Sequence, residues 1–190
     1  VRVGLWLGRD HYQVGFHQTA TAGAFGATVA AGRLLGLDRA QMEMALGLVS
    51  TRASGLKSQF GTMGKPLNAG LAAETGVLAA LWAQAGMTSA DSGLSGPLGF
   101  GATHHGAGNI AALDGMGVDW LMRDISHKFH ACCHGLHATL EALAGLDADV
   151  AQMTIQTHPR WMSVCNQAAP TTGLGAKFSY STVLAMHFLG

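Results

Sequence analysis

The chain of 190 residues is long enough for one sizeable domain, or for one domain and part of another. Only 12% of its residues are charged, about half the usual share, while 48% are hydrophobic. Its net charge is zero with histidine counted as neutral, which excludes the basic surface that binding to nucleic acids or anionic membranes requires. A solvated monomer needs more surface charge than this. We therefore expect a partner subunit, or further parts of a longer chain, to cover much of the surface.

Neither a membrane-spanning segment nor a secretion signal is recognisable in the sequence. The longest uncharged apolar stretches are too short, and too rich in glycine and threonine, to cross a bilayer. The chain opens on "VRVGLWLGRD", without an initiator methionine, and we expect it to be an excerpt of a longer protein. Its three cysteines form neither a disulfide framework nor a Cys-x-x-Cys metal motif. These features predict a cytoplasmic protein with reduced cysteines.

Helical patterns dominate the first three quarters of the chain. Apolar residues recur at helical spacing in "AFGATVAAGRLLG" (24–36), "RAQMEMALGLVSTRAS" (39–54) and "AGLAAETGVLAALWAQAG" (69–86), and Asp38 and Asn68 stand at the predicted starts of the last two helices. The chain holds 27 glycines, nearly double the average rate. Each interior glycine weakens a helix by about 1 kcal/mol relative to alanine. We therefore expect these glycines to permit close approach of helices in a tightly packed bundle.

The later part of the chain changes character. After a loop-like stretch, a helix is predicted at "CCHGLHATLEALAG" (132–145). Alternating apolar and polar residues then predict a β-strand over 150–158, followed by a last helix from about Phe178. The pattern as a whole predicts a mainly α fold, with a helical bundle domain over residues 1–146 and the beginning of a small α+β domain over residues 147–190.

Three histidines in "HACCHGLHATLEAL" form a candidate ligand site. His130, His134 and His137 would share one face of a continuous helix, because they are spaced i, i+4, i+7. Such a face could surround a metal ion, line a site for an anionic ligand, or supply polar contacts at a helix start. Gly135 and the uncertain helix start weigh against a metal. We expect no bound metal and a contact with an anionic ligand.

A formal dinucleotide-binding fingerprint occurs at "GAGNIA" (106–111). That motif has meaning only after a hydrophobic strand and within a βαβ unit, and neither is predicted here. The stretch is better interpreted as a loop of small residues, so no nucleotide cofactor is expected.

His17 and Lys65 each precede a predicted helix. His17, with Tyr12 nearby, lies just ahead of Thr19. Lys65 has no acidic residue within eight positions and stands before the predicted helix at Asn68. A helix N-terminus attracts a carboxylate through its unpaired N–H groups and its dipole, and a histidine exchanges protons near neutral pH. The pair could clamp a di- or tricarboxylate. Alternatively, the histidine caps a helix in the core and the lysine lies in solvent.

Four segments together resemble the MmgE/PrpD family: "GFHQTATAGAFGATVAAGRLLGLD", "GTMGKPLNAGLAAETGVLAAL", "KFHACCHGLHATLEAL" and "NQAAPTTGLGAKFS". Their order and spacing match, whereas residues 87–125 match poorly and nothing is carried over from them. The resemblance implies a large helical domain, a smaller α+β lid, a homodimer and an active site between the two domains. It also implies a cofactor-independent reaction on a small polycarboxylate, and N-terminal helices that would contribute further site residues.

The resemblance also assigns residues. His17 matches the histidine of the family's "GFH" segment and Lys65 the lysine of its "KPLH"-like segment, so both are expected to be catalytic. Asn68 stands where many members have histidine, so ligand contacts at this point are expected to differ. We assign proton transfer to His17 and charge stabilisation to Lys65, although the roles could be exchanged. The expected substrate-binding residues are Tyr12, Thr19, Asn68, His130, His134 and His137.

The function that this resemblance implies is a lyase. Elimination of the 2-methylcitrate dehydratase type is the leading activity, and a decarboxylase would belong to the same class. The alternatives are an epimerase of an iminodisuccinate-like substrate and a non-catalytic helical module that retains the fold. The chain by itself is expected to be inactive.

Overall fold

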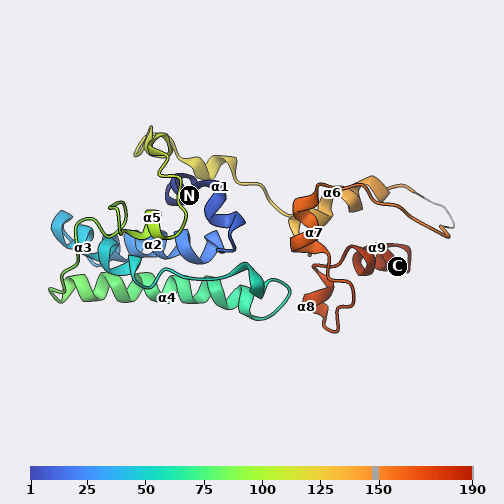
Figure 1. Cartoon of the computed structure of the whole chain (residues 1–190), viewed down its shortest axis with the longest axis horizontal. Coiled ribbons are helices and arrows are strands. Elements are labelled where there is room, and N and C mark those ends of the chain that lie inside the picture. Colours follow the sequence, from blue (N-terminus) through green and yellow to red (C-terminus); the bar gives the residue numbers. More distant parts are fainter. Residues whose placement is uncertain (147–149, 190) are drawn as a thin grey trace. The chain divides into compact units, whose positions relative to one another are not determined.

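The structure, a computed structural model, describes residues 1–146 and 150–189 (Figure 1). The described residues form helices and no β-sheet, so the predicted mainly α fold is confirmed. The α-helices are α1 (Arg2–Gln13), α2 (Gln18–Leu34), α3 (Arg39–Ser50), α4 (Gly64–Gln84), α5 (Phe100–Thr103), α6 (His134–Leu143), α7 (Pro159–Cys165), α8 (Gly173–Ala176) and α9 (Tyr180–Leu189), with short 3-10 helices at Lys57–Gln59, Ile110–Leu113 and Leu121–Asp124.

The chain separates into two compact units. The first contains residues 1–58 and 64–125, and the second contains residues 59–63 and the chain from Ser126 onward. The predicted domain boundary after residue 146 falls on residues 147–149, which lie outside the described residues. The division into domains 1–146 and 147–190 therefore stays a prediction.

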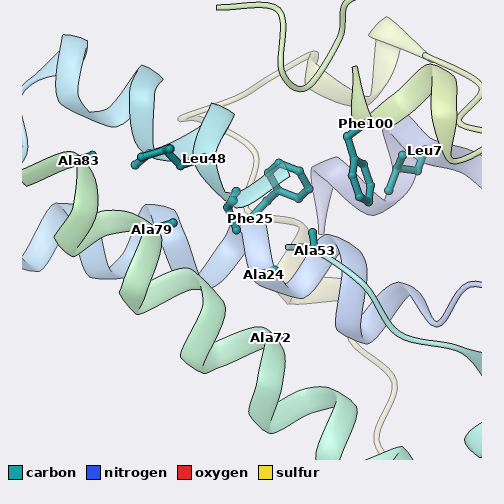
Figure 2. Packing of buried hydrophobic residues seen from close by; sticks show 11 residues of the cluster. Leu7, Ala24, Phe25, Leu48, Ala53, Ala72, Ala79, Ala83 and Phe100 are labelled. Carbon is teal, nitrogen blue, oxygen red and sulfur yellow. The ribbon is translucent and has the colours of Figure 1, made fainter. Parts of the chain in front are cut away.

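The first unit is built on packing of α2 against α4, with α3 and α1 beside them. Its core is rich in alanine and contains two aromatic side chains, Phe25 and Phe100, which meet edge to face at 5.2 Å between ring centroids (Figure 2). Small side chains let helix axes approach, and the aromatic pair fills the remaining volume. The buried cluster consists of Leu7, Ala24, Phe25, Ala45, Leu48, Val49, Ala53, Ala72, Ala79, Ala83 and Phe100.

Gly76 shows why the helices contain so much glycine. A Cβ atom built at this position would lie 2.4 Å from the Cβ of Ala27 and 2.6 Å from the backbone nitrogen of Thr28 on α2. Contacts this short between Cβ and backbone do not occur without displacement of one helix. At this crossing the expectation that glycine permits close helix packing is confirmed.

The predicted start of α3 is confirmed in detail. The Asp38 carboxylate accepts a hydrogen bond from the Gln41 backbone nitrogen at 2.8 Å, and the Gln41 side chain accepts one from the Asp38 nitrogen at 3.1 Å. This reciprocal capping box satisfies two N–H groups that would otherwise lack helical partners.

The predicted start of α4 is wrong by one turn. The helix begins at Gly64, so Lys65 lies in its first turn rather than in a turn before it. Pro66 is compatible with this position, because backbone nitrogens of the first turn have no helical acceptor to lose. The prediction relied on Asn68 as the residue at the helix start, whereas Asn68 lies one turn inside the helix.

The second unit packs α6 against α7 and α9. Its buried cluster consists of Cys132, Cys133, Leu136, Val164, Cys165, Phe178 and Tyr180. The Tyr180 hydroxyl donates a hydrogen bond to the Gly135 carbonyl at 2.8 Å and so connects α9 to α6. The expected last helix is present and begins at Tyr180.

The β-strand predicted over 150–158 is not formed. Exposure nevertheless alternates along the segment: Met153, Ile155 and Thr157 are half-buried, and the residues between them are exposed. The alternation was therefore interpreted correctly as one-sided burial. A strand also needs a hydrogen-bonded neighbour, and no other described segment pairs with this one.

Candidate active site

His17 is held at the junction between a short loop and α2. It occupies the N-cap position of α2, and its backbone nitrogen donates to the Gly55 carbonyl at 2.9 Å. The Lys57 nitrogen donates to the Gly15 carbonyl at 2.8 Å, so residues 15–17 pair with residues 55–57. Gly55 has a φ of +153°, and a Cβ there would lie 2.3 Å from the Cβ of Ala20. Only glycine fits this close pairing.

Asn68 meets the His17 side chain. Its amide nitrogen lies 3.2 Å from His17 Nδ1 and 3.3 Å from the Leu56 carbonyl oxygen. Both side chains are buried, with 7% of each residue exposed. The structure thus brings together two residues that are far apart in sequence, although the role of Asn68 in substrate binding stays a prediction.

Lys65 lies near enough to act on His17 electrostatically. Burial lowers the pKa of His17 below its ordinary value, and the positive charge of Lys65 lowers it further. Both effects disfavour the imidazolium. Near neutral pH both effects favour the neutral imidazole of His17, which lies close to the positive charge of the half-buried Lys65.

Tyr12 and Thr19 lie on either side of this junction. The Lys57 ammonium donates to the Tyr12 carbonyl at 3.0 Å and stands 4.1 Å from the centroid of the Tyr12 ring, in a cation–π contact. Thr19 lies exposed in the first turn of α2. Their expected contacts with substrate stay predictions.

A buried network next to His17 was missed by the sequence analysis. His11 is fully buried on α1, and its Nδ1 lies 2.6 Å from the His104 carbonyl oxygen. Its Nε2 lies 2.8 Å from the Thr21 hydroxyl. Because a carbonyl only accepts, Nδ1 of His11 carries the proton and the hydroxyl of Thr21 donates to Nε2 in the neutral form. No local pattern signals this arrangement, since the acceptor at His104 lies 93 positions away.

His130, His134 and His137 form a cluster in the second unit. The ring centroid of His137 lies 5.1 Å from that of His130 and 5.2 Å from that of His134. His130 precedes α6, so the premise that all three share a helix face is wrong. Its Nε2 instead bonds Glu141 on α6, and this contact brings the ring beside the helix.

The His137 imidazole is the most buried of the three. Burial lowers its pKa, and positive charge on His130 or His134 lowers it further. Its Nε2 atom is buried and makes no hydrogen bond within the part of the chain that the structure describes. A buried polar atom without a partner is rare in a folded protein and suggests a contact with a ligand. Within residues 1–146 and 150–189, no three His, Cys, Asp or Glu side chains are arranged to hold a metal ion.

The chain belongs to the MmgE/PrpD family. Residues 1–112, which include His17 and Lys65, match the MmgE/PrpD N-terminal domain. The chain is 34% identical over 148 residues to a cis-aconitate decarboxylase of Aspergillus terreus, an alignment that covers 73% of this chain and 30% of that protein. It is 31% identical over 155 residues to a cis-aconitate decarboxylase-like protein of Aspergillus oryzae, covering 76% and 32% respectively. The chain thus spans about a third of the length of these relatives.

The sequence contains no recognisable membrane-spanning segment. Among the residues that the structure describes, no helix combines the length and the apolar character that crossing a bilayer requires.

Proposed function

We propose that the intact protein is a lyase that acts on a small di- or tricarboxylate by acid–base chemistry, with His17 and Lys65 in its active site. The observation that carries the proposal is the pairing of a buried neutral histidine with a nearby lysine, at the two positions that match the family's motifs. The resemblance to cis-aconitate decarboxylases supports this class of reaction.

The chemistry of these reactions fits the two side chains. Elimination and decarboxylation of a polycarboxylate both place negative charge next to a carboxylate that is already charged. A lysine ammonium stabilises such charge, and an imidazole supplies a hydrogen bond or a proton. The lysine ammonium and the imidazole supply the charge stabilisation and the proton transfer themselves, so the proposal assigns no step to a metal or an organic cofactor. Within the second unit, the buried Nε2 of His137 is a separate candidate for a ligand contact.

Proton NMR of the intact protein with a panel of di- and tricarboxylates in deuterated water tests the proposal. Elimination gives new vinyl signals, decarboxylation gives a shortened product, and epimerisation gives deuterium exchange without loss of carbon. We expect elimination or decarboxylation of at least one substrate, and no loss of activity after exhaustive dialysis against a chelator. Exchange alone would favour the epimerase alternative, and binding without any turnover would favour a non-catalytic module.

We also propose that the intact protein is a homodimer. Support comes from the small charged fraction of the sequence and from large apolar side chains that remain exposed on the helices. Sedimentation equilibrium of the intact protein gives the subunit number directly.

A further inference from the structure

The orientation of the Asn68 amide group follows from its two neighbours. The same amide nitrogen lies within hydrogen-bond distance of the Leu56 carbonyl oxygen and of His17 Nδ1. An amide NH₂ group has two protons to donate, and a carbonyl oxygen can only accept. Rotating the amide by half a turn would place its own oxygen against the oxygen of Leu56. The Leu56 carbonyl therefore selects the orientation with the NH₂ group toward His17.

This orientation determines which nitrogen of His17 carries the proton. A hydrogen bond from the Asn68 NH₂ group requires a lone pair on Nδ1, so in neutral His17 the proton resides on Nε2. We propose that Asn68 is a positioning residue that holds neutral His17 in the Nε2–H tautomer, so that His17 meets the substrate as a hydrogen-bond donor and not as a base at Nε2. The inference about substrate rests on the function proposed above.

A neutral donor suits this location. Burial and the charge of Lys65 both disfavour an imidazolium at His17, whereas a neutral Nε2–H group can still bond a carboxylate or the oxyanion of an enolate-like intermediate. Neutral imidazoles serve in this way as electrophiles in other enzymes. Proton abstraction then falls to a group other than His17 Nε2, which distinguishes between the two role assignments that the sequence left open.

The identity of residue 68 determines this contact. A histidine, which the family resemblance would place there, can either donate or accept through its ring nitrogens and so permits either tautomer of His17. The NH₂ group of Asn68 can only donate. Replacement by aspartate reverses the polarity of the contact with little change of shape, because a carboxylate accepts a hydrogen bond from Nδ1–H.

Long-range proton–nitrogen NMR spectra of the intact protein, labelled with ¹⁵N-histidine and free of substrate, read the tautomer directly. The His17 signals are assigned by their loss in His17→Gln. In the wild type at neutral pH we expect a protonated Nε2 and an unprotonated Nδ1. In Asn68→Asp we expect the proton on Nδ1, and in Asn68→Ala a mixture of the two tautomers. A protonated Nδ1 in the wild type, or an unchanged tautomer in Asn68→Asp, would overturn the assignment.

Turnover separates this inference from the proposed function. We expect Asn68→Asp to lower kcat on the order of 10-fold or more, as loss of an orienting residue does, with little change in KM. The control is Thr75→Ser, a buried position two turns further along α4, with unchanged kcat. If the wild type shows the expected tautomer but no turnover, the proposed function fails and the tautomer assignment stands. If Asn68→Asp does not fold, the wild-type spectrum alone still decides the assignment.

Discussion

At the scale of single residues, Lys65 stands in an unfavourable place. It lies in the first turn of α4, where the positive end of the helix dipole repels a cation by about 0.3–1 kcal/mol. An acidic residue would stabilise this turn. A cation that opposes local stability, at a position matched by a family motif, is typical of a residue retained for function.

Replacing Lys65 by methionine should therefore affect catalysis more than folding. Lys65→Met preserves most of the side-chain length and removes the charge. If the ammonium stabilises developing charge, kcat of the intact enzyme should fall on the order of 10²-fold. The free energy of unfolding should change by less than about 1 kcal/mol, because the lost dipole repulsion offsets lost contacts. Steady-state kinetics and urea denaturation measure the two quantities. A kcat close to that of the wild type would show that Lys65 is only a surface residue.

His11 should make the stability of the protein depend on pH. Burial is the largest effect and lowers the pKa of His11 below 6.5. The hydrogen bond to the His104 carbonyl raises this pKa, whereas positive charge on His104 or His105 lowers it further. Below about pH 6.5, His11 therefore binds a proton in the unfolded chain but stays neutral in the folded chain until the pH reaches its lower folded pKa. The stabilisation is complete above this pH and is lost as the pH falls toward the folded pKa, at most about 1.4 kcal/mol per pH unit for one proton.

Thermal unfolding of His11→Gln at several pH values tests this dependence. Between about pH 8 and pH 5.5, the melting temperature of His11→Gln should fall less than that of the wild type, because one titrating group is gone. At the upper pH the variant should be less stable, because buried hydrogen bonds are lost. Ser126→Ala, at an exposed position without a titratable group, is the control and should keep the wild-type dependence. Identical dependence in His11→Gln would refute the assignment.

At the scale of elements, the crossing of α2 and α4 depends on Gly76. Gly76→Ala should destabilise the protein by about 1–3 kcal/mol, because the added methyl group meets the backbone of α2. Gly70→Ala is a matched control on the same helix, since a Cβ there has nothing within 4 Å. It should stabilise the helix by up to about 1 kcal/mol. Chemical denaturation of both variants gives the comparison, and equal effects of the two would contradict the packing argument.

At the scale of the whole molecule, the exposed side of α4 is largely apolar. Leu67, Leu71, Val77 and Leu81 are each more than 40% exposed, and Glu74 is the one charged residue on that side of the helix among the described residues. Such a surface associates in water. Residues 1–190 expressed alone should therefore self-associate.

Light scattering at increasing concentration measures this association. Leu71→Glu combined with Leu81→Glu should lower the apparent mass toward that of a monomer. Ala30→Glu combined with Ala40→Glu adds the same charge at exposed positions of α2 and α3 and should have little effect. Circular dichroism confirms that the variants stay folded. A monomeric wild type would show that this surface does not drive association.

The sequence alone predicted the helices α2, α3, α4, α6 and α9 and the family, and it selected His17 and Lys65 as candidate site residues. These follow from local causes: the helical period of apolar residues, the Asp38 capping box, and short motifs whose letters are contiguous. Even there, the choice of Asn68 as the helix start placed the start of α4 one turn too late. The strand over 150–158 failed for another reason. Alternation reports which side of a segment is buried, whereas a strand requires a partner that lies elsewhere in the chain.

Only the tertiary structure shows which atoms surround His17 and His11. The contact between Asn68 and His17 joins residues 51 positions apart, and the contact between His11 and His104 joins residues 93 positions apart. Neither can be inferred from neighbours in sequence. The tautomer of a histidine depends on which atoms surround its two nitrogens, and burial sets its pKa. Both are properties of the packed chain, because only folding brings those atoms together and removes the water between them.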